Sequence, residues 1–305
     1  MSGIKHLSII GIGLIGSSVA RAAKANGACE QITLFDASED VRIAADALGL
    51  GEVADSLESC VADADLVILC TPVGTMETIA TTIAPHLKAG AIVSDVGSVK
   101  SAVFSALSPH LPDHVHFIPG HPIAGTEKSG PTAGFATLFA GRWCILTPPD
   151  NEADGEALKS LTAFWETLGS TVEIMTIERH DRVLAITSHL PHLIAFNIVG
   201  TAHDLETVTE GEVVKFSAGG FRDFTRIAAS DPTMWRDVFL HNKEAVLEML
   251  GRFNEDLAAL QRAIRWGEGD QLHAFFERTR GLRQSIVDAG QDTDATNFGR
   301  DKTKD

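Results

Sequence analysis

Three short segments of this chain carry residue types suited to acid-base chemistry. They run from Asp95 to Lys100, from Gly120 to Gly130 and from Ser188 to His192, and they combine glycines, hydroxyls, imidazoles and cations. Neutral imidazole is the common proton acceptor near pH 7. Hydride removal from a carbinol carbon leaves a protonated carbonyl unless a base is near. His121, within the second segment, is therefore a candidate base, and we predict that the protein oxidises a carbinol by hydride removal.

A glycine-rich turn from Gly11 to Gly16 lies between a β-rich run and a helical stretch, Ser17 to Asn26. Gly11 permits a tight turn, Gly13 lets the backbone approach a pyrophosphate, and Gly16 lets the helix pack on the strand. The amino end of the helix adds free amide donors and a partial positive charge. The pattern predicts a dinucleotide site, although the same glycines could simply form a tight turn.

An acidic residue follows the second predicted strand at the spacing that a dinucleotide site requires. Asp36 stands 20 residues after Gly16, and Ala37 rather than an arginine comes next. A carboxylate there accepts hydrogen bonds from a ribose diol and repels a 2′-phosphate, so we expect NAD rather than NADP. Asp36 could also be an ordinary turn residue. The other residues expected at the cofactor are Leu14, Ile15, Thr71, Pro72, Val73 and Gly97.

The catalytic segments resemble those of the prephenate and arogenate dehydrogenase family, also called the cyclohexadienyl dehydrogenases. The likeness covers nearly all of residues 5 to 290 and extends through 219 to 226 and 231 to 236. The segments DVGSVK and HPIAGTEKSG are specific to this family rather than to Rossmann proteins in general. The resemblance implies oxidative decarboxylation of prephenate, arogenate or both in tyrosine synthesis, with hydride transfer to NAD.

The resemblance also implies roles for individual residues. His121 matches the catalytic histidine that contacts the ring hydroxyl, and Ser98 matches the serine that orients this hydroxyl and the histidine. Arg226 matches the arginine that binds the ring carboxylate, a role that suits a guanidinium because it can donate two parallel hydrogen bonds. The other residues expected to line the substrate pocket are His180, His189, His192, Arg222 and Thr126.

Each catalytic residue also has a structural explanation. His121, followed by Pro122, could be a turn residue, and Ser98 could cap a helix that begins near Val99.

The charged residues and the histidine pair likewise leave alternatives open. Arg226 could form an ion pair with Asp223 or Asp231. Lys100, Glu127 and Lys128 could be solvated charges or contacts that gate the site. His189 and His192 are three residues apart but have no acidic or cysteine ligand at usable spacing, so we expect no metal.

The first half of the chain alternates β-rich runs with helical stretches, which is typical of βαβ units on a parallel sheet. A helix from about 154 to 168 and a strand from Thr171 to Met175 follow. We therefore expect an α/β fold, with an N-terminal Rossmann-type doubly wound parallel sheet followed by an all-α C-terminal dimerisation domain. The other predicted strands are His6 to Ile10, Gln31 to Phe35, Leu66 to Cys70, Ile92 to Asp95, His116 to Ile118 and Trp143 to Leu146.

Residues 179 to 290 contain two prolines and no convincing strand, which predicts helices. One predicted helix face carries an apolar seam whose steps alternate four and three, formed by Val246, Leu250, Phe253, Leu257, Leu260 and Ile264. The seam needs a partner helix, either the one bearing Leu272 and Phe276 or one from a second subunit. A small helical domain has little core of its own, so we expect a homodimer through it. Ser230, Asp231 and Pro232 predict that a long helix starts there.

Length, charge and composition set further limits. With 305 residues we expect two domains, 1–178 and 179–290, and a flexible tail, 291–305. Twenty-five Lys and Arg against 41 Asp and Glu give a net charge of −16, which argues against nucleic acid and anionic membranes as partners. The four cysteines form no CxxC pair, and we expect reduced thiols and a cytoplasmic protein. No apolar run approaches 18 uninterrupted residues.

Two other functions fit parts of the sequence. One is another Rossmann dehydrogenase with a helical second domain, of the β-hydroxyacid dehydrogenase or imine reductase type. Such enzymes place a lysine or aspartate where this chain offers histidines. The other is a NAD-binding module without catalysis, for which we would expect an appended partner domain. Little sequence precedes the first strand or follows Gly290, so we expect neither a fused mutase nor a regulatory domain.

Overall fold

Six parallel strands form the larger sheet, in the order β3, β2, β1, β4, β5, β6. The computed structural model describes residues 3–126, 128–206 and 215–288. The strand order reverses between β1 and β4, and open sheets of this kind bind ligands at the carboxyl ends of the strands beside such a point. The strands are β1 His6–Ile10, β2 Gln31–Phe35, β3 Glu52–Val53, β4 Leu66–Leu69, β5 Ile92–Asp95 and β6 His116–Phe117.

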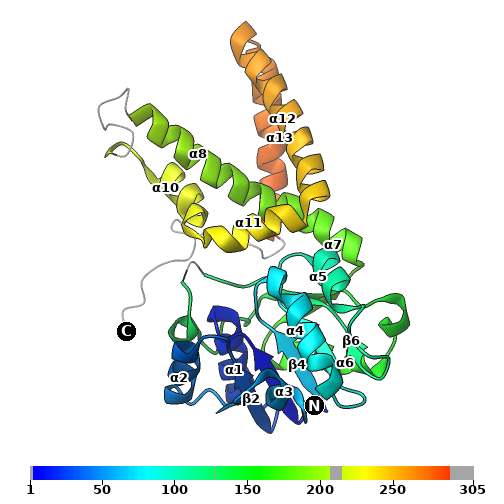
Figure 1. Ribbon diagram of the computed structural model, residues 1–305. Coiled ribbons are helices and arrows are strands. Elements are labelled where there is room, and N and C mark those ends of the chain that lie inside the picture. Colours follow the sequence, from blue (N-terminus) through cyan, green and yellow to red (C-terminus); the bar gives the residue numbers. More distant parts are fainter. Residues whose placement is uncertain (1–2, 127, 207–214, 289–305) are drawn as a thin grey trace. The chain divides into compact units, whose positions relative to one another are not determined.

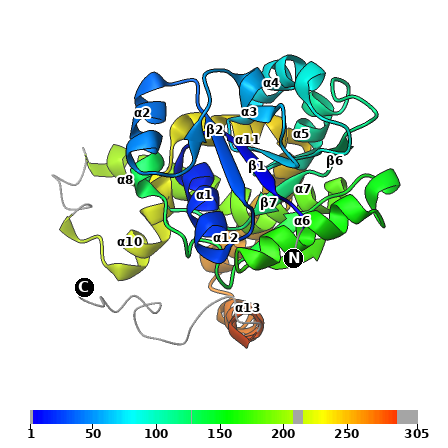
Figure 2. The ribbon, with the colours of Figure 1, turned by 90° about the horizontal axis from the view of Figure 1, so that it is seen from below.

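Helices cover both faces of this sheet (Figures 1 and 2). One apolar core contains the buried faces of α1 Leu14–Asn26, α2 Glu39–Ala47 and α6 Glu156–Thr167. The other contains those of α3 Leu57–Val61, α4 Met76–Ile83 and α5 Lys100–Leu107. Because both faces are covered, β4 is buried along its whole length. The predicted doubly wound parallel sheet is therefore confirmed.

A second sheet contains three strands in the order β7, β8, β9. β7 Gly120–Pro122 is antiparallel to β8 Trp143–Leu146, which is parallel to β9 Thr171–Ile174. The sequence predicts β8 and β9 but treats Gly120 to Pro122 as loop. It misses β7 because three residues with a glycine and a proline show no strand pattern. Pairing with β8 through His121 and Ile145 makes this segment a strand.

The described part of the chain beyond residue 176 is helical, as predicted. The elements are α7 Ile177–Leu184, a π-helical turn Ala185–His189, α8 Leu190–Glu206, α10 Gly219–Thr225, a 3-10 turn Arg226–Ala229, α11 Pro232–His241, α12 Lys243–Trp266 and α13 Gly269–Asp288. Further 3-10 turns are Val73–Thr75, Ala84–His86, Pro131–Ala133 and Asp150–Glu152.

The chain forms two compact units, one up to Leu247 and one from Glu248 onward. All the site residues that the sequence predicts belong to the first unit, whereas most of the apolar seam lies in the second. The division at 178/179 stays a prediction. The predicted tail, 291–305, lies outside the described residues.

The helix predicted at Ser230, Asp231 and Pro232 begins as expected. The Asp231 carboxylate accepts a hydrogen bond from the Met234 amide at 2.7 Å, and Pro232 is the first helical residue. α11 is only 10 residues long, because Asn242 leaves helical geometry with φ −112° and ψ 34°. α11 packs its Trp235 and Val238 side chains in a small apolar cluster with Val99. This packing brings α11 to the start of α5.

Candidate active site

The glycine turn after β1 is shaped by contacts at two of its three glycines. Gly11 has a φ of +94°, and a Cβ added there would lie 2.6 Å from the Cys70 carbonyl oxygen. A Cβ on Gly16 would lie 2.0 Å from the Gly11 carbonyl oxygen. A Cβ on Gly13 would meet nothing within 4 Å, so open space adjoins the backbone there. The first turn of α1 has no acidic residue and no side-chain cap, which suits a pyrophosphate.

Asp36 and Thr71 flank this turn. The Asp36 carboxylate accepts hydrogen bonds from the Ile12 amide at 2.8 Å and the Ser38 amide at 2.9 Å. It therefore supports the turn and still has lone pairs for a ribose diol. The Thr71 hydroxyl is buried and has no hydrogen-bond partner among the described residues. A buried hydroxyl without a partner is expected where a ligand supplies one. These residues fit a dinucleotide.

The other residues predicted at the cofactor lie around the same edge of the sheet. Leu14 and Ile15 open α1, and Pro72 and Val73 follow β4.

Gly97 lies after β5 and has a structural role. Its amide donates to the Asp95 carboxylate at 2.7 Å, and a Cβ on Gly97 would lie 2.9 Å from that oxygen.

A buried ion pair joins the end of β5 to β7. Lys100 is fully buried, and its ammonium group donates to the Asp95 carboxylate and, at 2.6 Å, to the Gly120 carbonyl. The Gly120 amide donates back to Asp95 at 3.1 Å. Burial lowers the pKa of Lys100, and the negative charge of Asp95 opposes this effect. The alternative of a solvated charge is therefore wrong for Lys100. Lys100 fixes the strand that carries His121.

Lys128 is exposed, and Glu127 lies outside the described residues.

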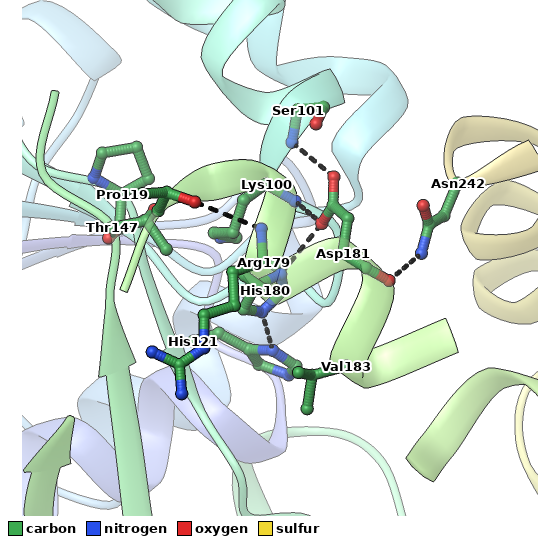
Figure 3. A network of polar contacts seen from close by, with 12 residues as sticks. Lys100, Ser101, Pro119, His121, Thr147, Arg179, His180, Asp181, Val183 and Asn242 are labelled. Atoms are coloured by element: carbon green, nitrogen blue, oxygen red, sulfur yellow. Dashed lines mark hydrogen bonds and ion pairs between the residues drawn. The ribbon is translucent and has the colours of Figure 1, made fainter. Parts of the chain in front are cut away.

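His121 is 8% exposed and contacts a second histidine. Its Nδ1 lies 2.8 Å from Nε2 of His180 (Figure 3). Burial holds the pKa of His121 well below its usual value, and the nearby His180, Lys100 and His189 act in the same direction. His121 is therefore neutral at pH 7 and able to accept a proton. Its place in strand β7, paired with Ile145, removes the alternative of a simple turn residue.

The helix after Ser98 is capped from another part of the chain. Val99 occupies the N-cap of α5 and provides no side-chain hydrogen bond, so the alternative that Ser98 caps this helix is wrong. The Asp181 carboxylate accepts from the Lys100 amide at 2.8 Å and the Ser101 amide at 2.9 Å instead (Figure 3). Ser98 is left half-buried beside the start of the helix.

The predicted pocket histidines of α7 and the π-helical turn are both fully buried. His180 lies behind His121, and its Nδ1 is 2.8 Å from the Asp181 carboxylate. His189 Nδ1 lies 3.1 Å from the side-chain amide of Asn242. Burial lowers the pKa of His189 to about 4, with His180 acting in the same direction.

His192 and Arg226 share a second part of the site. The His192 ring stacks on Trp235, with centroids 3.7 Å apart and planes at 22°, and its Nδ1 donates to the Ser188 carbonyl at 2.9 Å. Burial lowers the pKa of His192, and the positive charge of Arg226 adds to this effect. The two predicted residues are therefore neighbours, although 34 positions separate them in the sequence.

Arg222 and Thr126 lie apart from the buried histidine contacts described above. The Arg222 side chain is 78% exposed and lies 3.7 Å from the Asp223 carboxylate. Thr126 is exposed in the loop after β7, where its hydroxyl accepts from the Lys128 amide at 3.2 Å. Their roles at a substrate stay predictions.

Four polar or aromatic contributors were not singled out as site residues from the sequence: Asp95, Asp181, Trp235 and Asn242. Asp95 and Asp181 carry a usable signal, because the first ends a buried strand and the second directly follows a histidine. Trp235 and Asn242 carry none, since their contacts depend on how α11 packs. In the described part of the chain, no group of three or more His, Cys, Asp and Glu side chains could hold a metal ion.

The fold and the site define a class of protein: an α/β oxidoreductase with a dinucleotide turn and a buried neutral histidine beyond the carboxyl ends of the strands. The family described as prephenate dehydrogenase, nucleotide-binding domain, matches residues 19–174. Its companion, prephenate dehydrogenase, dimerization domain, matches residues 176–278. The chain belongs to the prephenate dehydrogenase family.

Individual relatives agree over most of their length. The cyclohexadienyl dehydrogenase of Zymomonas mobilis is 44% identical over 287 residues, which cover 94% of this chain and 97% of the relative. The prephenate dehydrogenase of Aquifex aeolicus, solved with hydroxyphenyl propionate and NAD+, is 37% identical with a TM-score of 0.85, and the match covers 92% and 98% of the two chains.

A third relative, the arogenate dehydrogenase of Synechocystis, is 28% identical with a TM-score of 0.78, over 92% of this chain and 99% of that one. The predictions of family, fold class and enzyme class are confirmed. The membership favours a dehydrogenase of this family over the β-hydroxyacid dehydrogenase type and over a non-catalytic module.

Proposed function

We propose that this protein oxidises and decarboxylates prephenate, arogenate or both, with hydride transfer to NAD, in tyrosine biosynthesis. The observation that carries the proposal is His121, a neutral buried imidazole in the same compact unit as the glycine turn. Bound NAD supplies the hydride acceptor. The family membership and the NAD+ in the Aquifex aeolicus complex support this choice.

The chemistry asks little more of the chain than position and one proton acceptor. As hydride leaves the ring carbon that bears the hydroxyl, His121 accepts the hydroxyl proton and a ring carbonyl forms. The bond to the ring carboxylate then breaks, CO₂ departs, and its electron pair makes the ring aromatic. The proton returns from His121 to the ring oxygen, so the net products are the phenol, CO₂ and reduced cofactor. Aromatisation makes the sequence effectively irreversible.

Arg226 is the residue that we assign to the ring carboxylate. It belongs to the same compact unit as His121 and lies near His192, and a guanidinium can hold a carboxylate with two parallel hydrogen bonds. Local positive charge is needed because the chain carries a net charge of −16. His192, held by Trp235, lines the same part of the pocket, and Ser98 orients the ring hydroxyl.

NAD is favoured over NADP by Asp36. Its carboxylate lies at the end of β2 beside the glycine turn, where a 2′-phosphate would meet negative charge. Replacing Asp36 with Ala should lower the NAD to NADP ratio of kcat/KM by about tenfold or more, the loss of at least one charged hydrogen bond. An unchanged ratio would mean that Asp36 serves the turn alone.

The proposed function is tested by mixing protein and cofactor with each candidate substrate and following absorbance at 340 nm. A matrix of prephenate and arogenate against NAD and NADP gives four values of kcat/KM. We expect reduction of NAD with at least one of the two cyclohexadienes, and none with a saturated hydroxy acid control. No reduction with either cyclohexadiene would refute the proposal.

We further propose a soluble, cytoplasmic homodimer. Among the described residues, one helix, from Ile177 to Leu205, is long and apolar enough to cross a membrane by length and composition, and 28% of its most apolar window is buried. Two observations support a place for this helix in the folded protein instead. It carries the buried side chains of His180 and His189, and it lies in the segment that matches a dimerization domain.

Exposed apolar side chains of α8 and of the second unit support a subunit interface. Among them are Ile198, Leu205, Leu257, Ile264, Phe276 and Leu282. Burying such groups in a partner subunit is favourable, at about 25 cal/mol for each Å² of apolar surface. Light scattering on a sizing column should give twice the chain mass of 32.5 kDa. A monomer at micromolar concentration would contradict the dimer.

A further inference from the structure

Two fully or nearly fully buried ionisable side chains, His180 and Asp181, have no part in the reaction as described above. They form an unbroken chain of contacts with His121 (Figure 3). We propose that Asp181, acting through His180, fixes the tautomer of His121, so that its Nδ1 carries the proton and its Nε2 presents a lone pair to the substrate hydroxyl. His180 and Asp181 are then positioning residues. This inference rests on the proposed function for its catalytic consequence alone.

The first link of the chain is the carboxylate. The pKa of Asp181 is lowered to about 2 because it accepts hydrogen bonds from His180 and from the amides of Lys100 and Ser101, which together outweigh the cost of burial. An ionised carboxylate is an acceptor and cannot donate. The atom facing it at 2.8 Å, Nδ1 of His180, must therefore carry a hydrogen.

The second link is the imidazole of His180. Burial lowers its pKa, and the positive charge of Lys100 acts in the same direction, against the opposing effects of Asp181 and Asp95. His180 therefore holds one proton, on Nδ1, and its Nε2 is an acceptor. Nδ1 of His121 lies 2.8 Å from that acceptor and must donate to it. Since His121 is itself neutral, its Nε2 is left as a bare lone pair.

The charged and titratable groups that act on His180 within the described residues fit this arrangement. They are Asp181 on its own helix, His121 from β7, Asp95 and Lys100 from β5 and α5, and His189 from the π-helical turn. Asp95 and Lys100 are paired with each other. Asp181 is thus the negative group in direct contact with the His180 ring.

The carboxylate that starts the chain is itself fixed. Each of its oxygens accepts an amide from the first residues of α5, Lys100 and Ser101, and the backbone carbonyl of Asp181 accepts from the Asn242 side chain at 2.9 Å. Asp181, which lies on α7, is therefore held by the first residues of α5 and by the C-cap residue of α11. The helix start that Asp181 caps also follows Ser98, so one carboxylate positions both the base and the segment of the predicted serine.

A change of one oxygen to an amide nitrogen should reverse the tautomer. In Asp181→Asn, an NH₂ in the Oδ1 position donates to Nδ1 of His180, and an oxygen in the Oδ2 position still accepts from the Ser101 amide, while the Lys100 amide loses its acceptor. His180 must carry its proton on Nε2 and donate it to His121, whose Nε2 then holds the hydrogen and cannot accept one. In a comparable hydrogen-bonded series of a carboxylate, a histidine and a nucleophile, an Asp to Asn change that gives the wrong tautomer lowers kcat by a factor on the order of 10⁴.

Asp65→Asn provides a matched control. Asp65 also accepts two backbone amides, those of Lys5 and His6 at 2.8 Å, and it pairs with Lys88. It lies at the amino end of the sheet and contacts no histidine side chain through its carboxylate within the described residues. The control therefore loses a comparable carboxylate without touching the chain of imidazoles.

The experiment reads the tautomer directly. Two-bond ¹H–¹⁵N correlation spectra of ¹⁵N-histidine-labelled protein distinguish Nδ1–H from Nε2–H for each of the 12 histidines, and His121→Asn identifies the His121 signals. We expect Nδ1–H for His121 in the wild type and in Asp65→Asn, and Nε2–H in Asp181→Asn. We expect kcat to fall about 10³- to 10⁴-fold in Asp181→Asn, with the Kd for NAD unchanged, and to stay within threefold in Asp65→Asn.

A wild-type spectrum with Nε2–H on His121 would overturn the inference, even if Asp181→Asn fails to fold. So would an Asp181→Asn protein in which the His121 tautomer is reversed while kcat matches that of Asp65→Asn. If the wild type shows Nδ1–H but reduces no NAD with either cyclohexadiene, the proposed function fails and the tautomer assignment stands.

Discussion

The glycine turn and the histidine network are built in opposite ways. The turn is one continuous stretch, Gly11 to Gly16, whose shape follows from close contacts with its own backbone and the neighbouring β4 end. The network joins His121 to residues 59 and 60 positions further along the chain, through contacts made by α7. A continuous motif tolerates change elsewhere in the protein. A network assembled from several elements depends on how all of them pack, and a substitution there should affect both chemistry and stability.

The largest expected effect is at the base itself. His121→Asn should lower kcat by about 10³- to 10⁴-fold with the Kd for NAD preserved, because the turn that binds the cofactor is separate from the acceptor. Stopped-flow reduction of NAD and a binding titration measure the two quantities. Wild-type turnover in this variant would contradict the assignment of His121 as the catalytic base. Because burial holds the pKa of His121 well below 6.5, wild-type kcat/KM should persist as pH falls through that value.

Removing the guanidinium should act on substrate binding alone. For Arg226→Ala we expect KM for prephenate to rise about 10- to 100-fold, the loss of a charged hydrogen-bonding group, with the Kd for NAD unchanged. Arg252→Ala is a matched control, since Arg252 is exposed and pairs with Glu248 one turn away. An unchanged KM would show that the ring carboxylate is held elsewhere.

The glycine turn can be split into its steric and its binding parts. Gly16→Ala forces a clash with the Gly11 carbonyl and should lower Tm as well as NAD affinity. Gly13→Ala meets only open space, so Tm should hold while the Kd for NAD rises about tenfold through lost pyrophosphate contact, worth about 1.4 kcal/mol. Unchanged NAD affinity in Gly13→Ala would favour the simpler explanation of a tight turn without a ligand.

The smallest and most gradual effect is that of pH on stability. Burial lowers the pKa of His121, His180 and His189 in the folded protein, the last to about 4. Below pH 6.5 these histidines are protonated in the unfolded chain but stay neutral in the folded protein. The free energy of unfolding should therefore fall as pH drops from 6.5 toward 4. His189 alone contributes on the order of 3 kcal/mol to this loss.

Asp181, with its pKa lowered to about 2, should weaken the fold in a second step below pH 3.8. Urea unfolding at several pH values measures both steps. A free energy of unfolding that stays flat from pH 6.5 to 4.5 would contradict the burial of neutral histidines.

The sequence by itself determined the parallel sheet, the dinucleotide turn and the identity of the candidate base. Alternating β-rich and helical runs reflect burial along each element, and the three glycines are required by contacts within a few residues of one another. Local sterics and periodicity are readable without knowing where distant segments lie. The cap of α11 at Asp231 and Pro232 was predictable for the same reason.

Only the tertiary structure decided what surrounds His121. From the sequence, Lys100 could be a solvated charge or a contact that gates the site, but in the structure it is a buried partner of Asp95. The start of α5 is capped by Asp181 rather than by Ser98. Strand β7 exists because β8 pairs with it. Hydrogen bonds and desolvation act between groups a few ångströms apart in space, whatever their separation along the chain. The sequence therefore identifies His121 as the candidate base, but not the groups that decide which of its ring nitrogens carries the proton.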